Sequence, residues 1–271
     1  MCQGFGPGGH AGFGGVMISQ DMSSPLEAPV CRRCGMCCLR GGPTLMVDDA
    51  SRLVSGALTL DSLVCLRKGE WARDDVRGGL WPLEQEHIKV AGLGGQAHPW
   101  RCRYYRDGSG CAIYAQRPVQ CSALFCMDTT PLEDLLSGTP LMDRAEAFRI
   151  LASEAHLPGF PALDAGTRAL LPDLMAAHEE QSPAAPVLET AARLGFAPQG
   201  VQVHDAGAMD AEERQTLLAH LGETVRTEAA FRQLCVERAG VPEAILPFLL
   251  GRALRDLLAE VGLRPTAADE V

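Results

Sequence analysis

Features that define several protein classes are missing from this sequence. No run reaches about 18 apolar residues, the length that a membrane-spanning helix needs, and the best candidate, residues 245–251, ends at Arg252. The first residues do not form a basic segment followed by an apolar one, so we expect no secretory signal. These absences predict a soluble, cytoplasmic protein without a membrane partner. Cysteines stay reduced in that compartment, so disulfides are not expected either.

Motifs of familiar enzyme chemistry are also missing. The N-terminal glycines precede no helix that could receive a phosphate, so the chain has no Walker loop. No serine, histidine and aspartate arrangement for nucleophilic catalysis is evident. His98 lies four residues before Cys102, but we expect an exposed histidine in a turn rather than a metal ligand. The catalytic residues are therefore unknown, and the sequence leaves open whether the protein is an enzyme.

What the sequence does contain is an uneven distribution of charge and cysteine. The 271 residues carry a net charge of −10; the 13 basic and 12 acidic residues before position 131 nearly balance, whereas 11 basic and 22 acidic residues follow. Nine of the eleven cysteines fall between Cys31 and Cys126. The acidic balance makes a nucleic-acid partner unexpected, although the acidic region could bind a protein partner. The change in composition predicts a domain boundary near residues 130–140.

Three regions follow from this boundary. Residues 1–29 hold seven glycines among the first fifteen positions, which predicts a flexible N-terminus. Residues 30–130 form the predicted cysteine-cluster metal-binding domain, and residues 140–264 form a helical domain. The expected fold class is α+β, with a loop-rich cysteine-cluster domain followed by a mainly α-helical C-terminal region.

Periodic leucines and capping residues predict the helices. The pattern Asp210-x-x-Glu213 is a capping box for a helix that ends at Gly222. The same reasoning places Thr227 at the start of a separate helix and Pro242 in the first turn of another. These last two helices are expected over 227–240 and 242–258. Others are expected over 48–63, 141–155, 167–179 and 184–194.

The densest cysteine motif is Cys31-Arg-Arg-Cys34-Gly35-Met-Cys37-Cys38. Four thiols within eight residues can reach one small volume if the backbone turns tightly, and Gly35 supplies the freedom in φ that such a turn needs. Disulfides explain the spacing poorly, because a bridge between adjacent cysteines is strained and bridges three residues apart close loops too short to constrain much. Clustered thiolates are instead typical ligands of zinc and iron.

A second set of four cysteines begins 64 residues after Cys38 and consists of Cys102, Cys111, Cys121 and Cys126. The turn sequence at 107–110 could return Cys102 beside Cys111 as a hairpin. The two sets fit either two four-thiolate sites or one site with supporting thiols. Cys65 and Cys235 have apolar neighbours, so we expect them in the core.

Together the two motifs resemble the YkgJ-type cysteine-cluster family, which is described as zinc- or iron-chelating. The resemblance covers about residues 30–128 and includes a signature at Ile113, Tyr114, Arg117 and Pro118. It implies eight metal ligands: Cys31, Cys34, Cys37, Cys38, Cys102, Cys111, Cys121 and Cys126. We expect Arg117 and Tyr114 beside the cofactor, in contact with the ligands rather than the metal, because Pro118 fixes the backbone next to Arg117. Ser122 departs from the family, in which a basic residue is common there.

The spacing leaves zinc and iron open. Cys-x-x-Cys-Gly resembles a zinc knuckle, whereas Cys31-x-x-Cys34-x-x-Cys37 repeats the opening of a bacterial ferredoxin motif without its closing Cys-Pro. We therefore expect a protein that holds zinc or iron, or an iron–sulfur cluster, in a structural, accessory or metal-handling role. The alternative is an iron–sulfur enzyme or electron carrier, related by analogy to flagellin lysine-N-methylases.

Overall fold

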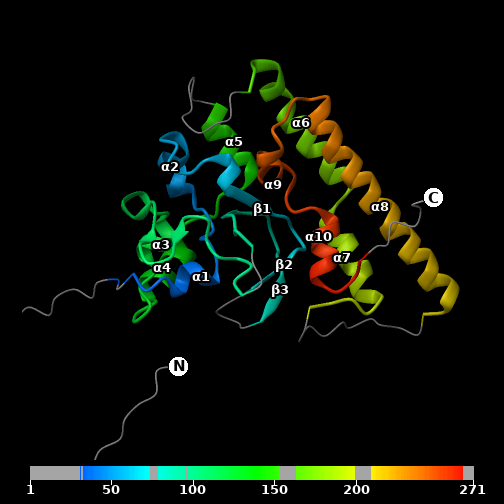
Figure 1. Cartoon of the computed structure of the whole chain (residues 1–271), viewed down its shortest axis with the longest axis horizontal. Coiled ribbons are helices and arrows are strands. Elements are labelled where there is room, and N and C mark those ends of the chain that lie inside the picture. The colour runs from blue at the N-terminus through cyan, green and yellow to red at the C-terminus, as the bar shows by residue number, and fades with distance from the viewer. Residues whose placement is uncertain are drawn as a thin grey trace, which may run out of the picture. The chain divides into compact units, whose positions relative to one another are not determined.

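The computed structural model of the chain describes residues 31, 33–73, 79–94, 97–152, 163–198 and 209–264. The chain divides into two units, Met1–Arg32 and Arg33–Val271. Only Cys31 is described in the first unit, so the flexible N-terminus predicted for residues 1–29 lies outside the described residues. The elements below all belong to the second unit (Figure 1).

Short elements build the N-terminal half of the second unit. Its α-helices and 3-10 helices are α1 (Met36–Arg40), η1 (Val47–Asp49), α2 (Ala50–Val54), η2 (Leu60–Ser62), η3 (Tyr114–Gln116), α3 (Val119–Ala123) and α4 (Thr130–Gly138). Its strands form two-stranded antiparallel sheets: β1 (Leu63–Leu66) with β4 (His87–Val90), β2 (Trp71–Arg73) with β3 (Leu80–Pro82), and β5 (Tyr105–Arg106) with β6 (Gly110–Cys111). Every residue of β1 is buried, so this strand lies in the core.

The described secondary-structure elements of the C-terminal half are all helices. Its helices are α5 (Arg144–Ala152), α6 (Ala165–Gln181), α7 (Ala184–Arg193), α8 (Ala211–Glu237), η4 (Glu243–Ile245), α9 (Leu246–Leu250) and α10 (Leu254–Glu260). The long helices α6 and α8 pack against each other (Figure 1). The predicted α+β class with a helical C-terminal region is confirmed. None of the described helices combines the length and the apolar character that crossing a membrane requires.

Helix α8 corrects the prediction of two separate helices over this part of the chain. Its N-terminus is as expected, because the Asp210 side chain accepts a hydrogen bond from the Glu213 backbone N–H at 2.8 Å. The helix then continues through Gly222 and Thr227 without a break. An interior glycine costs a helix only about 1 kcal/mol, and α8 packs against α6, α7 and α10. Packing along its length therefore outweighs the local stop and start signals.

Two other predicted helices are interrupted at glycines with positive φ. The helix expected over 242–258 breaks at Gly251, whose φ is 72°, and a Cβ there would lie 2.9 Å from Arg67 Nε. The helix expected over 48–63 is reduced to α2, and Gly56 follows it with a φ of 74°. A left-handed residue ends a helix, so these two glycines set the boundaries that leucine spacing did not reveal.

One hydrophobic core extends across the predicted domain boundary near 130–140. Leu45 and Ile88, from the N-terminal half, share a buried cluster with Met142, Ile245 and Phe248 from the C-terminal half. A second cluster lies among α7, α8 and α10. The two halves are therefore packed together, and their division into separate domains stays a prediction.

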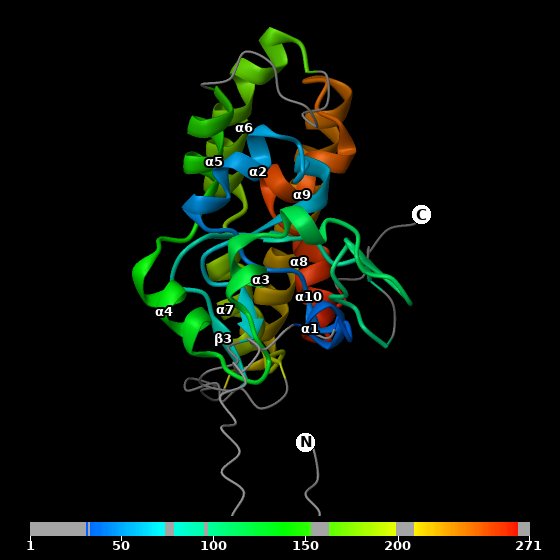
Figure 2. The ribbon, with the colours of Figure 1, turned by 90° about the vertical axis from the view of Figure 1, so that its left-hand side faces the viewer.

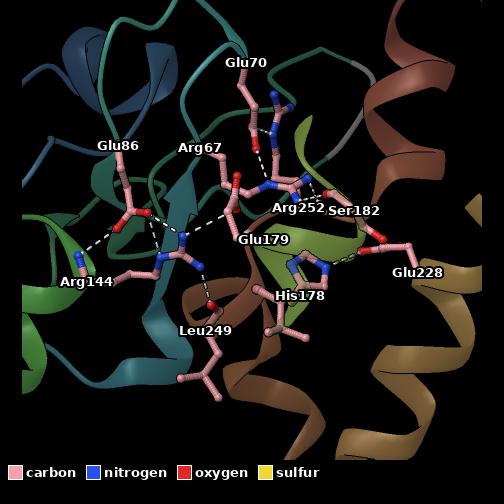
Figure 3. Close-up of polar contacts among 12 residues, drawn as sticks. Arg67, Glu70, Glu86, Arg144, His178, Glu179, Ser182, Glu228, Leu249 and Arg252 are labelled. Atoms are coloured by element: carbon pink, nitrogen blue, oxygen red, sulfur yellow. Dashed lines mark hydrogen bonds and ion pairs between the residues drawn. The ribbon is translucent and has the colours of Figure 1, made fainter. Parts of the chain in front are cut away.

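A network of buried charges also joins the two halves (Figure 3). Arg67 follows β1, is 1% exposed, and forms an ion pair with Glu70 at 3.2 Å. Its guanidinium donates to the carbonyls of Ser182, at the end of α6, and Arg252, between α9 and α10, both at 3.1 Å. Arg252 Nε in turn donates to Glu70 Oε2 at 2.9 Å. Removal of one partner from such a buried pair costs about 3–5 kcal/mol.

Two further buried pairs extend this network. Arg144 at the start of α5 donates from Nε to Glu86 Oε2 at 2.8 Å and from Nη1 to the carbonyl of Leu249 in α9. His178 in α6 is 0% exposed, and its Nε2 lies 3.2 Å from Glu228 Oε1 in α8 (Figure 3). Each pair connects elements far apart in the sequence, so the network fixes how the helices pack on the β1–β4 sheet.

Acid should destabilise this fold through His178. Burial lowers the pKa of His178 below its ordinary value of 6.5, and the positive charges of Arg67 and Arg232 lower it further, although the hydrogen bond with Glu228 opposes the shift. The folded chain therefore binds this proton less readily than the unfolded chain. The free energy of unfolding should be highest above about pH 6.5 and decrease as the pH falls below that value.

Urea unfolding at about pH 7.5 and about pH 5.5 measures this effect on both sides of the ordinary histidine pKa. His178→Gln should lose less unfolding free energy between the two conditions than the wild type. The control is His220→Gln, at an exposed position, which should behave like the wild type. An equal loss in all three proteins would show that His178 is not the responsible group.

Candidate metal centre

The first cysteine motif turns at Gly35 immediately before α1. Gly35 has a φ of 78°, and α1 carries Cys37 and Cys38. A Cβ at Gly35 would lie 2.4 Å from ring atoms of Tyr105, which is closer than side chains approach one another. Glycine is therefore required for two reasons, the left-handed backbone and the tyrosine ring against it. The tight turn expected at Gly35 is confirmed.

The second motif begins with the hairpin expected from residues 107–110. Strands β5 and β6 pair Tyr105 with Cys111. Next to the hairpin, the backbone N–H of Cys102 donates to the carbonyl of Cys38 at 2.8 Å. A main-chain hydrogen bond thus joins the two motifs, which lie far apart in the sequence.

The thiols of Cys37 and Cys38 form the centre of a group of interacting cysteines. Their sulfur atoms lie 3.9 Å apart. A hydrogen bond from Cys38 lowers the pKa of Cys37 to about 6. The same hydrogen bond and partial burial raise the pKa of Cys38, and the negative charges of Cys102 and Cys121 raise it further. Cysteines of both motifs therefore lie within electrostatic reach of one another.

Cys121, on α3, belongs to the same group. Burial raises the pKa of Cys121 to about 12, with added contributions from the charges of Cys102, Cys37 and Cys111. Burial also raises the pKa of Cys102, and the charge of Cys111 adds to this effect. Neighbouring like charges disfavour one another's ionisation, and a bound cation would offset this effect. Thiolates are the donors that zinc and iron–sulfur centres use, so the donor chemistry fits such a group.

The thiol group is defined by these five residues: Cys37, Cys38, Cys102, Cys111 and Cys121. Cys34 and Cys126 are exposed, and none of the interactions described for the thiol group involves either residue. Cys31 is exposed and belongs to the other unit. Nowhere in the described ranges do three cysteine, histidine or acidic side chains already enclose a position for a metal ion. The eightfold ligand set implied by the resemblance stays a prediction.

The other cysteines and His98 lie where the sequence suggested. Cys65 and Cys235 are buried in the core, and burial raises the pKa of both thiols. All ten cysteines of the described residues are free. His98 is exposed, so it lies in the kind of environment expected for a turn histidine.

Tyr114, in the second motif, contacts Arg33 of the first motif. The guanidinium of Arg33 lies 4.1 Å from the centre of the Tyr114 ring, and that of Arg117 lies 4.2 Å from it. Arg117 Nη1 also donates to the Tyr114 carbonyl at 3.1 Å. Arg33 has a φ of 54°, a strained conformation for a residue other than glycine. The sequence singled out Arg117 and Tyr114, whereas a role for Arg33 beside the thiols and a place on a solvated basic surface stayed equally open; its adjacency to Cys34 was the available signal.

Residues 44–49, which include no candidate ligand, hold the start of helix α3 by hydrogen bonds. The buried Asp49 carboxylate accepts hydrogen bonds from the backbone N–H groups of Val119, at 2.9 Å, and Met46, at 3.0 Å. The backbone N–H of Thr44 donates to Gln120 Oε1 at 2.7 Å. In the sequence, Asp49 lies at the start of the helix predicted over 48–63, and its partner Val119, 70 residues away, could not be inferred.

In the described unit, α1, α3 and α4 lie on the side away from α8, and Figure 2 turns that side toward the viewer. Helices α3 and α4 pack against each other. The elements that carry the thiol group therefore lie in the N-terminal half, away from α8.

Comparison with known proteins agrees with this location. Residues 30–135 match the model of the CxxCxxCC family, described as "Putative zinc- or iron-chelating domain". No curated protein and no solved structure matches the chain. The match includes all eight candidate cysteines and confirms the resemblance to a zinc- or iron-chelating cysteine family. It does not extend to the helices from α5 onward.

Gly35→Ala should weaken the contact between the two motifs. The new Cβ would meet the Tyr105 ring and strain the left-handed backbone, at a cost of about 1–3 kcal/mol in unfolding free energy. Denaturant unfolding under reducing conditions measures the loss. The control is Gly138→Ala, because a Cβ at Gly138, the last residue of α4, meets nothing within 4 Å. Equal stabilities of the two variants would refute the role assigned to Gly35.

Proposed function

We propose that the region of residues 30–135 chelates zinc or iron through one composite thiolate site that uses both cysteine motifs. The observation that carries this proposal is the thiol group, in which Cys37 and Cys38 interact with two cysteines of the second motif, Cys102 and Cys121. The hydrogen bond from Cys102 to Cys38 supports it, because the backbones of the two motifs meet there. The match to a chelating family supports the same chemistry.

The proposed ligands are the thiol group together with Cys31, Cys34 and Cys126. Binding requires some thiol side chains to rotate, since no three described ligands already enclose a metal position. The bound metal would supply the positive charge that allows neighbouring thiols to remain deprotonated. Tyr114 and Arg117 are proposed to support the ligands: the Tyr114 ring, between two guanidinium groups, keeps the segment before α3 against the first motif.

We favour a metal-handling role because the site is accessible. Cys34, Cys37 and Cys126 are all exposed, so an incoming thiol or chelator can approach the ligands directly. A closed structural site would surround its ligands more completely. Reversible holding of the ion is therefore the function that this accessibility supports best.

The number of thiols also fits a second function, in which the cysteines hold an iron–sulfur cluster. A single tetrahedral ion uses about four thiolates, and the thiol group alone has five members. An iron–sulfur cluster, with further cysteines beside it, would account for this surplus. The protein would then be an iron–sulfur enzyme or electron carrier rather than a metal-handling protein.

Analysis of zinc, iron and acid-labile sulfide after anaerobic purification distinguishes the two functions. Zinc without sulfide or colour is the result expected for metal handling. Iron with matching sulfide and broad absorption near about 400 nm, where thiolate-bound clusters absorb, would favour the second function. Purified protein that retains neither metal would exclude both.

Cys121→Ser should remove most of the bound metal and lower stability at the same time, because a ligand is lost from a site whose binding energy stabilises the fold. Mass spectrometry of the metal content, together with thermal unfolding, measures both effects. The control is Cys235→Ala, which alters a core cysteine on α8 away from the thiol group. It should lose some stability through packing but keep its metal. Full metal occupancy in Cys121→Ser would eliminate that residue as a ligand.

A further inference from the structure

Asp49 is a buried carboxylate that lies between the two cysteine motifs in sequence but contacts the second. Its side chain is 0% exposed. Oδ1 accepts from the Val119 N–H at 2.9 Å, and Oδ2 accepts from the Met46 N–H at 3.0 Å. Both oxygens are therefore engaged by the backbone, so Asp49 is not free to serve as a metal ligand.

Arg52 provides the counter-charge and a second connection to the same place. Its Nη1 lies 3.3 Å from Asp49 Oδ1. Its Nε donates at 2.8 Å to the carbonyl of Arg117, two residues before Val119. Asp49 and Arg52 thus hold both sides of Pro118, where the chain enters α3.

The entry to α3 determines where Cys121 lies. Val119 is the first residue of this five-residue helix, and Cys121 is the third. A helix this short has little stability of its own, so its direction depends on the contacts at its start. Asp49 is also close enough to Cys121 for its charge to affect that thiol. A shift of the helix entry would therefore move Cys121 relative to the rest of the thiol group.

We propose that Asp49, with Arg52 as its counter-ion, is a positioning residue that places Cys121 against the thiols of the first motif. This assignment rests on the proposed function, since the purpose of the placement is a composite metal site. Cys102 does not depend on Asp49, because its own backbone N–H is bonded to the Cys38 carbonyl. Loss of the Asp49 carboxylate should thus displace Cys121 and leave Cys102 in place.

The test is thiol cross-linking in the full-length, metal-free, reduced chain. A short bifunctional thiol reagent is applied, and the links from Cys38 to Cys121 and from Cys38 to Cys102 are quantified by mass spectrometry. Asp49→Asn should lower the Cys38–Cys121 link severalfold and leave the Cys38–Cys102 link unchanged. The matched control is Asp48→Asn, which neutralises the neighbouring, exposed acid and should change neither link.

Two outcomes would overturn the proposal. Unchanged links in Asp49→Asn would show that Cys121 does not depend on Asp49. A parallel decrease of both links would show a general loss of structure instead of positioning. If Asp49→Asn fails to fold, Arg52→Gln decides the question, because it removes the counter-ion and the contact to Arg117 but leaves both backbone hydrogen bonds of Asp49. It should show the same selective loss to a smaller degree, and equal changes in both links would refute the role.

Metal release provides the second readout. Transfer of zinc to a chelator should be about 10-fold faster in Asp49→Asn, the scale on which residues that orient metal ligands act. In a Cys121→Ser background, the small fraction of zinc that remains bound should be released at the same rate with and without Asp49→Asn, because the thiol that Asp49 positions is gone. An additive effect would refute action through Cys121. Wild-type protein without metal would contradict the proposed function, whereas the cross-links of the metal-free chain would still decide the role of Asp49.

Discussion

Repulsion between neighbouring thiolates is the constraint on which this structure depends. The five members of the thiol group come from α1, the segment before β5, strand β6 and α3. The charges of neighbouring members oppose the ionisation of Cys38 and Cys121. The surrounding fold nevertheless holds them together by contacts that do not involve sulfur. Gly35 packs on Tyr105, Arg33 stacks on Tyr114, and Asp49 bonds to the start of α3. The protein therefore maintains a region of high potential negative charge, for which a metal cation or an iron–sulfur core is the natural complement.

The helical C-terminal half stabilises the N-terminal half through a shared core and buried ion pairs. The buried strand β1 and its partner β4 share a core with α9, and Arg67 connects the end of β1 to α6 and to the loop after α9. Charges this deeply buried are tolerated only when they are paired. The helices and the cysteine region are thus energetically linked, so a substitution that destabilises one should also destabilise the other.

Local chemistry made part of the fold and the site predictable from sequence. Gly35 was identified because a tight turn between thiols needs a left-handed residue, and the 107–110 turn predicted the hairpin that returns Cys111. The capping side chain of Asp210 likewise marked the start of α8. Each of these features depends on residues a few positions apart, where side-chain type and backbone geometry are directly coupled.

The features that escaped prediction depend on contacts between distant segments. Gly222 does not end α8, because three neighbouring helices stabilise it, and Gly251 ends α9 where Arg67 leaves no space for a side chain. The role of Asp49 escaped prediction because its partner Val119 comes close only in the folded chain. Sequence spacing also could not show whether the two motifs converge, which the hydrogen bond between Cys102 and Cys38 and the stacking of Arg33 on Tyr114 reveal.

Metal stoichiometry in two double variants tests the composite site most directly. One variant replaces Cys37 and Cys38 by serine, and the other replaces Cys102 and Cys121. If both motifs contribute to one site, each double variant should lose essentially all of the zinc or iron that the wild type binds. If each motif holds its own ion, each double variant should keep about half of the bound metal, as expected for independent four-thiolate sites. That second result would contradict a composite site built from both motifs.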